Sequence, residues 1–355
     1  MKQFKKSQEY HDNPGCTSVD RNKTTFSNLP KLILIGLLSI VLMLVMTACS
    51  NDAGADKKEP IIFADGGWDS LKFHNEIAGI IISEGYGYET ETISGSTAAL
   101  MKGIEQEEID IHMELWSENL GDIYFDGVEN GDYIQLSVNF DDNFQGLYVP
   151  TYVIEGDSAR GIDPIAPDLK YITDLPDYWE VFKDPEDEGK GRIIGSISGW
   201  TVDEILYEGI QEYGLDDHYN YFRPGSESSI NISLASAYEK GEPWIGYNYE
   251  PNWVMGKYDM TPILEEVEDG PLSSIGAQDI DIISNKSLPE RAPDVVDFLK
   301  KYKTSSLIAN NALVYIQDEK ASAHDAAIKF LHENEDIWTT WVPKEIAQKV
   351  KEAIK

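Results

Sequence analysis

Apolar residues recur along this chain in two patterns, short runs typical of strands and longer stripes with a helical period. The first pattern predicts strands over 60–64, 90–93, 109–115, 192–196 and 244–249. The second predicts helices over 70–84, 96–106 and 201–213, and helix starts near Pro293, Ser322 and Pro343. Because strands and helices alternate, we expect α/β units with a mainly parallel sheet.

Two stretches and one helix start carry more local predictions. Residues 145–154 are typical of extended chain broken by Pro150, and residues 155–191 favour loops because they are rich in Pro and Asp. Thr201 and Glu204 form a T-x-x-E pattern, which predicts a capping box at the start of the helix over 201–213.

The longest apolar run, residues 32–46, ends just before the small residues that precede Cys49. Basic residues come before it, and its length of about fifteen residues is short of the roughly twenty that a membrane-spanning helix needs. This pattern is typical of a signal peptide ending in a lipobox, where the thiol of Cys49 takes a lipid. The alternative is an uncleaved membrane anchor. The polar residues after Cys49 then predict a flexible tether.

Composition adds limits to this picture of an extracytoplasmic, lipid-anchored protein. Cys16 lies in the segment expected to be removed and Cys49 carries the lipid, so no internal disulfide is expected. The formal net charge is −34, and residues 1–48 carry six basic and three acidic side chains, which leaves the mature part near −37. So acidic a surface repels nucleic acids. It fits either a salt-loving host or a general means of solubility.

Four predicted strands lead into an aromatic residue at their carboxyl end. These aromatic residues are Trp68, Trp116, Trp200 and Tyr249. Ligands of open α/β sheets bind beyond the carboxyl ends of the strands, so the four rings are expected to share one site. Aromatic faces suit a soft, poorly hydrated cation such as a quaternary ammonium group. Any single tryptophan can instead belong to the core, which we expect of Trp179, Trp253, Trp338 and Trp341.

The helix start after Gly199 offers a second element of a site. The first amides of a helix are free and partially positive, so Trp200, Thr201 and Val202 are expected to seat a carboxylate mainly through their backbone. The alternative is an ordinary capped helix. Together, an aromatic cage and an anion seat would hold a small zwitterion.

Other chemistry is sparse in the sequence. The six histidines show no spacing typical of a metal site, and we expect His74 to be a packed or capping residue. There is no nucleophile elbow and no phosphate-binding loop. We therefore expect no catalysis, no metal and no cofactor.

Several motifs resemble those of a known family, the glycine betaine/proline betaine substrate-binding proteins of osmoprotectant ABC importers. The matching stretches are Gly67-Trp68-Asp69-Ser70, Gly95-Ser96-Thr97, Asp110-Ile111-His112-Met113-Glu114-Leu115-Trp116, Gln145-Gly146, Gly199-Trp200-Thr201 and Tyr247-Asn248-Tyr249-Glu250-Pro251-Asn252-Trp253. They run in order from about residue 61 to residue 253, and the helical remainder is consistent but less specific.

This resemblance implies a two-lobed α/β fold of the periplasmic-binding-protein type II, with the ligand in the cleft between the lobes. The division it suggests is a signal peptide over 1–48, a lipid-anchored tether over 49–59, lobe 1 over 60–148 plus 265–355, and lobe 2 over 149–264. It also implies that Trp68, Trp116, Trp200 and Tyr249 form the cage. The implied partners are an ABC permease and its ATPase, the membrane through the lipid anchor, and no nucleic acid.

One position departs from the family pattern. Some members place a carboxylate-binding histidine where this chain has Gly121. Either the backbone amides suffice, or Ser70, Tyr247 or Thr201 supplies a donor, or the ligand is not a simple betaine. The rival interpretations are a binding protein for choline, carnitine or an amino acid, a sensory ligand-binding module, and an extracellular lipoprotein enzyme.

Overall fold

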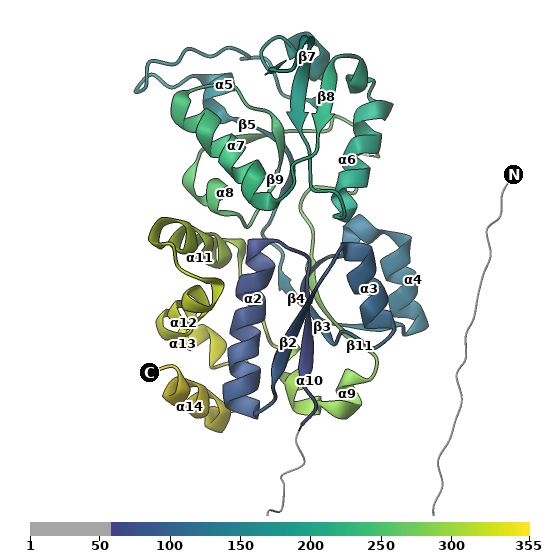
Figure 1. The fold of residues 1–355 in the computed structure, drawn as a ribbon, viewed down its shortest axis with the longest axis vertical. Helices are drawn as coiled ribbons and strands as arrows, with labels where there is room; N and C mark the ends of the chain where they lie inside the picture. The colour runs from purple at the N-terminus through teal and green to yellow at the C-terminus, as the bar shows by residue number, and fades with distance from the viewer. Residues whose placement is uncertain (1–57, 268) are drawn as a thin grey trace, which may run out of the picture. The chain divides into compact units, whose positions relative to one another are not determined.

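Two β-sheets flanked by helices organise the chain in the computed structural model (Figure 1). The structure describes residues 58–267 and 269–355. The predicted signal peptide, Cys49 and residues 49–57 of the tether lie outside the described residues. Within the described ranges, none of the helices combines the length and apolar character needed to span a bilayer.

The first sheet is mixed rather than mainly parallel. Its strands, in spatial order, are β2 (Thr90–Ser94), β1 (Ile61–Asp65), β3 (Ile111–Trp116), β11 (Ile280–Asn285) and β4 (Tyr133–Phe140). β1 pairs in parallel with β2 and β3, whereas β11 runs antiparallel to β3 and β4. The periodicity did not predict β4 or β11, and these two strands supply the antiparallel half of the sheet.

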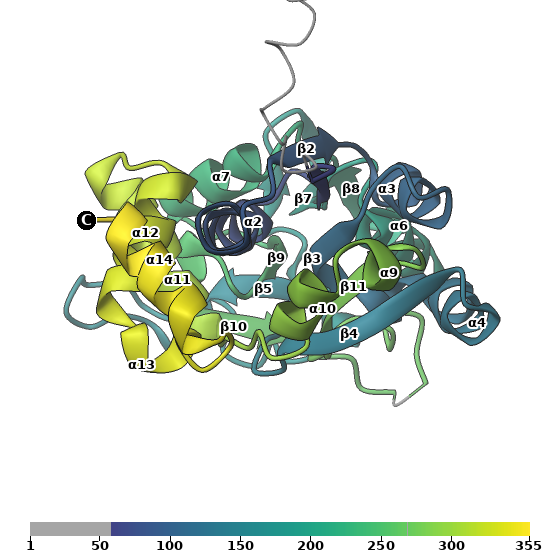
Figure 2. The same ribbon diagram turned by 90° about the horizontal axis from the view of Figure 1, so that it is seen from below.

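Helices cover this sheet on two sides. The early ones are α2 (Asp69–Ile80), which continues as a π-helical turn over Ile81–Tyr86, α3 (Thr97–Glu105) and α4 (Asp122–Asn130). The later ones are α9 (Leu288–Arg291), α10 (Pro293–Leu299), α11 (Ser306–Glu319), α12 (Ala323–Glu333), α13 (Glu335–Trp338) and α14 (Lys344–Ala353). Figure 2 shows α11 to α14 gathered beside α2, with α3 and α4 on the opposite side. The predicted helix starts at Pro293, Ser322 and Pro343 are confirmed, the last two as N-caps.

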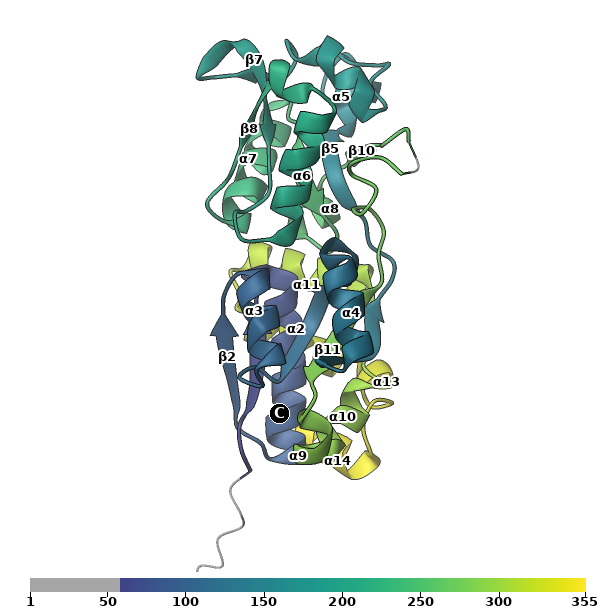
Figure 3. The ribbon, with the colours of Figure 1, turned by 90° about the vertical axis from the view of Figure 1, so that its right-hand side faces the viewer.

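The second sheet lies at the other end of the molecule (Figure 3). Its path is β10 (Met260–Ile263), β5 (Gln145–Pro150), β9 (Gly246–Tyr249), β7 (Asp187–Ile194) and β6 (Lys183–Asp184), with β8 (Tyr219–Phe222) also paired to β7. Its helices are α5 (Thr151–Glu155), α6 (Thr201–Glu212), α7 (Glu227–Lys240) and α8 (Trp253–Lys257). A 3-10 helix over Ile172–Tyr178 lies within the stretch predicted as loop.

The chain passes between the sheets twice, once between β4 and β5 and once between β10 and β11. The expected lobe division assigned residues 145–148 to lobe 1, but they pair with β9 and so belong to the second sheet. Periodicity gives no signal for such a crossing, because the chain stays extended on both sides of it. The expected extended stretch 145–154 also ends early, since α5 begins directly after Pro150.

The predicted capping box is wrong. The N-cap of α6 is Trp200, with extended backbone and no side-chain cap bond, so Thr201 is already the first helical residue. A Thr can cap only from the position before the helix. The helix therefore starts one residue earlier than the motif implied, and its first amides are left open.

The burial of several side chains agrees with the prediction that they are packed residues outside the ligand site. Trp338 and Trp341 are core residues, whereas Trp179 and Trp253 are only partly buried against the same core. His74 is fully buried and hydrogen-bonded to the Tyr302 hydroxyl, and burial lowers its pKa to about 3. It is a packed residue, as the sequence predicted.

A candidate ligand pocket between the two sheets

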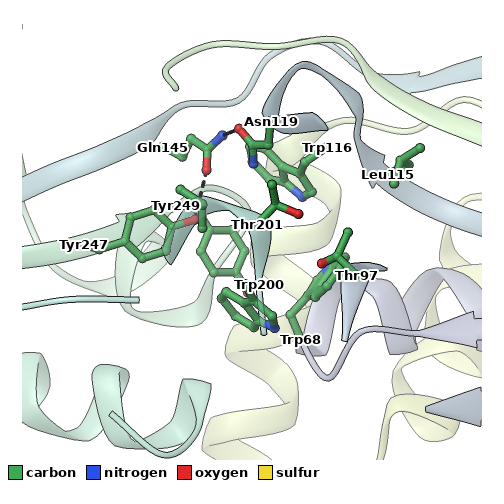
Figure 4. A pocket seen from close by; sticks show the side chains of 11 residues that line it. Trp68, Thr97, Leu115, Trp116, Asn119, Gln145, Trp200, Thr201, Tyr247 and Tyr249 are labelled. Carbon is green, nitrogen blue, oxygen red and sulfur yellow. Dashed lines mark hydrogen bonds between the residues drawn. The ribbon is translucent and has the colours of Figure 1, made fainter. Parts of the chain in front are cut away.

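A pocket opens between the two sheets, beyond the carboxyl ends of β3 and β9 (Figure 4). Its lining consists of Trp68, Thr97, Leu115, Trp116, Asn119, Gln145, Trp200, Thr201, Val202, Tyr247 and Tyr249. All four predicted cage residues and all three predicted seat residues are therefore brought together. About 40 Å³ is open to the centres of water-sized spheres, which is room for roughly three waters or one small ligand.

The four aromatic rings form a series in which each ring stands at a near right angle to the next, in the order Trp68, Trp200, Tyr249 and Trp116. The ring of Trp200 is 5.5 Å from that of Trp68 and 5.9 Å from that of Tyr249, with interplanar angles of 84° and 80°. The ring of Trp116 is 5.8 Å from that of Tyr249 at 85°. Rings in this edge-to-face order form the walls of a box, and their faces can surround one methylated nitrogen.

Both halves of the molecule place a tryptophan in the same local way. Trp68 is the N-cap of α2 and Trp200 is the N-cap of α6. Each follows a glycine with positive φ, +96° at Gly67 and +101° at Gly199, a conformation that other residues adopt only with strain. The other two walls, Trp116 and Tyr249, are the last residues of β3 and β9.

One buried carboxylate holds two of the walls. The Oε1 atom of Glu114 accepts hydrogen bonds from the indole nitrogen of Trp68 at 2.9 Å, from the indole nitrogen of Trp116 at 3.3 Å and from the Ser70 hydroxyl at 2.8 Å. Burial raises the pKa of Glu114 to about 8, because these donors do not replace the lost hydration of a charge. Ser70 thus supports Glu114 and does not itself line the pocket.

A second buried carboxylate holds the tyrosine wall. Glu227 of α7 accepts hydrogen bonds from the Tyr249 hydroxyl at 2.8 Å and from the Asn252 side-chain amide at 3.1 Å. Its other oxygen accepts the backbone amide of Asp69, at the start of α2, at 2.9 Å. Burial, followed by the charge of Asp69, raises the pKa of Glu227 to about 7.

Hydrogen bonds join the two halves around the pocket, and three of them lie at the starts of α2, α3 and α6. The Trp200 indole nitrogen donates to the Gly66 carbonyl at 2.9 Å, and the Thr97 amide donates to the Gly199 carbonyl at 3.1 Å. The bond from the Asp69 amide to Glu227 is the third. Trp200 therefore lines the pocket and also joins the two halves, through its hydrogen bond to the Gly66 carbonyl.

The starts of α2 and α6 differ in what occupies them. A carboxylate oxygen of Glu227 already sits on the first amide of α2. At α6 the Asp203 amide donates to the Trp200 carbonyl, while the amides of Thr201 and Val202 have no partner among the described residues. Both of these residues line the pocket. Among the described residues, the start of α6 thus leaves its first amides unpaired beside the pocket, whereas the first amide of α2 is already bonded to a carboxylate.

A chain of polar side chains closes another side of the pocket. The Tyr247 hydroxyl donates to Gln145 at 3.0 Å, and the Gln145 amide donates to Asn119 at 2.8 Å, as Figure 4 shows. Gln278 donates to the same Asn119 oxygen at 2.8 Å. Gly121, where some family members have histidine, has φ +54° and caps the start of α4 without lining the pocket.

Some residues of the site were not predicted from the sequence. Thr97, Leu115, Asn119 and Gln145 line the pocket, and Glu114 and Glu227 support its walls. Thr97, Leu115, Gln145 and Glu114 lay inside the family-like stretches, which was the only signal for them. In the part of the chain that the structure describes, no cluster of three or more His, Cys, Asp or Glu side chains is arranged to hold a metal ion.

Comparison with known proteins agrees with this geometry. Residues 59–333 match the family described as the substrate-binding domain of ABC-type glycine betaine transport systems. The chain belongs to this family. It is thus an extracytoplasmic substrate-binding protein of glycine betaine/choline-type ABC transport, which confirms the resemblance seen in the sequence.

Relatives and solved structures extend the comparison. A trimethylamine N-oxide-binding protein of Pelagibacter ubique is 24% identical over 316 residues, covering 86% of this chain and 98% of the relative. A glycine betaine/L-proline-binding protein from Borrelia burgdorferi superposes with a TM-score of 0.67 at 18% identity, over 82% of this chain and 99% of the other. A choline-binding protein in complex with choline gives 0.68 at 17% identity, over 83% and 98%. These structural matches confirm the predicted type II periplasmic-binding-protein fold.

Proposed function

We propose that the pocket binds a small osmolyte with a permanently charged, methylated nitrogen and an anionic oxygen, with glycine betaine as the first candidate. The observation that carries this is the placement of the open amides of Thr201 and Val202 in the same pocket as four aromatic rings, each edge-to-face with the next. The rings suit the methylated cation, and the amides suit the anionic end.

The energies are of the right order for such a ligand. Four aromatic faces contribute roughly 0.5–2 kcal/mol each, and two charge-assisted amide bonds roughly 1.5–3 kcal/mol each. Their sum is comparable to or larger than the roughly 8 kcal/mol of a micromolar complex, and desolvation and ordering offset the remainder.

Trimethylamine N-oxide is a second candidate. It carries three methyl groups and an anionic oxygen on one nitrogen, so it offers the rings and the amides of the pocket the same two kinds of group as betaine. The Pelagibacter ubique relative binds this compound according to its name.

The rest of the proposal concerns the setting of the protein. We infer that residues 1–48 are cleaved and that the lipid on Cys49 ties the protein to the membrane beside its permease. The chain binds the osmolyte and releases it to the permease, and the associated ATPase supplies the energy for import. The match to a substrate-binding domain of ABC transport systems supports this division of roles between the binding protein, the permease and the ATPase.

Calorimetry with a ligand series tests the proposal. Affinity should fall steeply from glycine betaine through dimethylglycine to glycine, because each lost methyl group exposes a more strongly hydrated ammonium. Choline should bind more weakly than betaine by about a hundredfold or more, since the loss of the carboxylate costs roughly 1.5–3 kcal/mol for each of the two charge-assisted bonds.

Each comparison has an outcome that contradicts one part of the proposal. Equal binding of glycine and glycine betaine would rule out the cage. Equal binding of choline and betaine would rule out the anion seat and favour choline as the ligand. Trimethylamine N-oxide binding more tightly than betaine would make the second candidate the first.

A further inference from the structure

The walls Trp68 and Trp116 are tied to one atom, the Oε1 oxygen of Glu114. We propose that Glu114 is a positioning residue that fixes both rings and gives up its proton when a cation enters the cage, so that ligand binding is linked to proton release. This inference rests on the proposed function, because it requires a ligand with a permanent positive charge.

The contacts of Glu114 are one-sided. All three of its donors, from Trp68, Ser70 and Trp116, converge on Oε1. The other oxygen, Oε2, is buried and has no hydrogen-bond partner among the described residues. Oε1 therefore behaves as the acceptor oxygen and Oε2 is the place for an exchangeable proton. Since Glu114 does not line the pocket, it acts on the ligand through the two rings and through its charge.

The groups that face Glu114 do not supply a fixed positive charge. The titratable ones are His112 on its own strand, Tyr249 on β9, Glu227 on α7 and Tyr302 after α10, and His74 on α2 is bonded to that Tyr302. Burial lowers the pKa of each histidine to about 3, so both are neutral near pH 7. Burial also raises the pKa of both tyrosines well above 10, so they are neutral as well.

Glu227 is the remaining group and is itself a carboxylate, which opposes ionisation of Glu114. Burial and this repulsion raise the pKa of Glu114 to about 8, and the carboxyl group is therefore mostly protonated in the empty protein at pH 7. A ligand cation within roughly 6 Å of the ring centres would be the first positive charge beside it. The cation favours the ionised form, so its entry lowers the pKa of Glu114 and expels the proton to solvent.

The direction in which ligand affinity changes with pH follows from the pKa of Glu114 in the empty protein and in the complex. The pKa of Glu114 is higher in the empty protein than in the complex, so the complex binds fewer protons. Affinity for a cation is then lowest when Glu114 is protonated in both states. It rises by up to about tenfold per pH unit between the two pKa values, and it levels off above about pH 8.

Calorimetry from pH 6 to pH 9 with tetramethylammonium and with glycine betaine tests the inference, since neither probe titrates in this range. Each titration is run in two buffers with different ionisation enthalpies, which counts the protons released. We expect the affinity of the wild-type protein to rise about tenfold or more from pH 6 to pH 8.5, with up to one proton released near pH 7. Glu114→Gln should release fewer protons than the wild-type protein and should lose the rise in affinity near pH 8, and the pH dependence that remains should come from Glu227, whose pKa burial raises to about 7.

Two further variants assign the proton. Glu118→Gln removes an exposed carboxylate near Trp116 and should leave the pH profile unchanged. Glu227→Gln removes the other buried carboxylate at the cage and should leave the release of the Glu114 proton in place. If Glu114→Gln does not fold, retention of proton release in both other variants still supports Glu114.

Several results would overturn the inference. Affinity that is independent of pH in the wild-type protein, with no proton released, would refute it while leaving the proposed function intact. Loss of the pH dependence in Glu227→Gln but not in Glu114→Gln would show that the released proton comes from Glu227, and this would refute the inference. Failure of both cations to bind at every pH would instead contradict the proposed function.

Discussion

The indole nitrogen of Trp200 provides a direct test of how the two halves are held together. Trp200→Phe keeps an aromatic face in the cage but removes the N–H that donates to the Gly66 carbonyl at 2.9 Å. Gly66 is buried, so its carbonyl would be left without a partner whenever the halves are closed. The substitution therefore raises the free energy of the closed, ligand-bound form.

The expected magnitude comes from two contributions. The lost hydrogen bond is worth roughly 0.5–1.5 kcal/mol, and an unsatisfied buried carbonyl costs roughly 1–3 kcal/mol. Because these figures overlap, we expect a net loss of about 1–3 kcal/mol, which corresponds to betaine binding about five- to a hundredfold more weakly. Stopped-flow fluorescence should show the change mainly as faster dissociation, since the bond exists only after closure.

Trp116→Phe is the matched control. It makes the same ring change but removes a longer bond, 3.3 Å, to Glu114 within one half, and Glu114 keeps two other donors. The difference in betaine dissociation rate between the two variants therefore reports on the hydrogen bond between Trp200 and Gly66. If Trp200→Phe dissociates no faster than Trp116→Phe, this bond does not contribute to ligand retention and the reasoning is refuted.

Three other substitutions test separate parts of the structure. Trp116→Ala should weaken betaine binding about tenfold, from a lost aromatic face worth roughly 0.5–2 kcal/mol plus packing, whereas Trp179→Ala, outside the pocket, should leave calorimetric affinity unchanged. Gly199→Ala should lower both betaine affinity and Tm, because Gly199 has φ +101° beside the pocket and the added Cβ would lie 3.3 Å from Ser96. Gly214→Ala, at φ +66° in open space, should lower Tm alone. Cys49→Ser should abolish palmitate labelling and release the protein from membranes without changing affinity; a labelled Cys49→Ser band would contradict lipidation at that thiol.

The meeting of the four aromatic residues in one pocket could be predicted from the sequence because its signal is local. Each aromatic residue follows a run that is itself recognisable as a strand, and the carboxyl ends of strands are where such sheets bind ligands. The structure places Trp68, Trp116, Trp200 and Tyr249 at those ends and in one pocket. The rule needed no knowledge of which strands are neighbours.

The supporting carboxylates could not be predicted in the same way. The chain has 63 Asp and Glu residues, so two more of them carry no information until their burial is known. Glu114 alternates with apolar residues along β3, a pattern typical of a solvent-facing side chain, yet it is fully buried. Only the fold shows that three donors from separate parts of the chain meet at its side chain.

β11 was missed for a related reason. All six of its residues are buried, but Asp281, Ser284 and Asn285 interrupt the apolar pattern. The structure satisfies them with distant partners: the Tyr124 hydroxyl and the Gln135 amide donate to Asp281, and Asn285 donates to Asp110. A buried polar strand of this kind looks like a loop until those partners are known.

The double crossing between the sheets also has a mechanical consequence. Two covalent connections leave the halves one soft rotation, about an axis through the connections, and restrain the others. The hydrogen bonds between the halves around the pocket, among them those of Trp200, Thr97 and Asp69, would then form and break almost together. Opening would be close to all-or-none, and lengthening either connection should blur this transition while leaving every residue that lines the pocket unaltered.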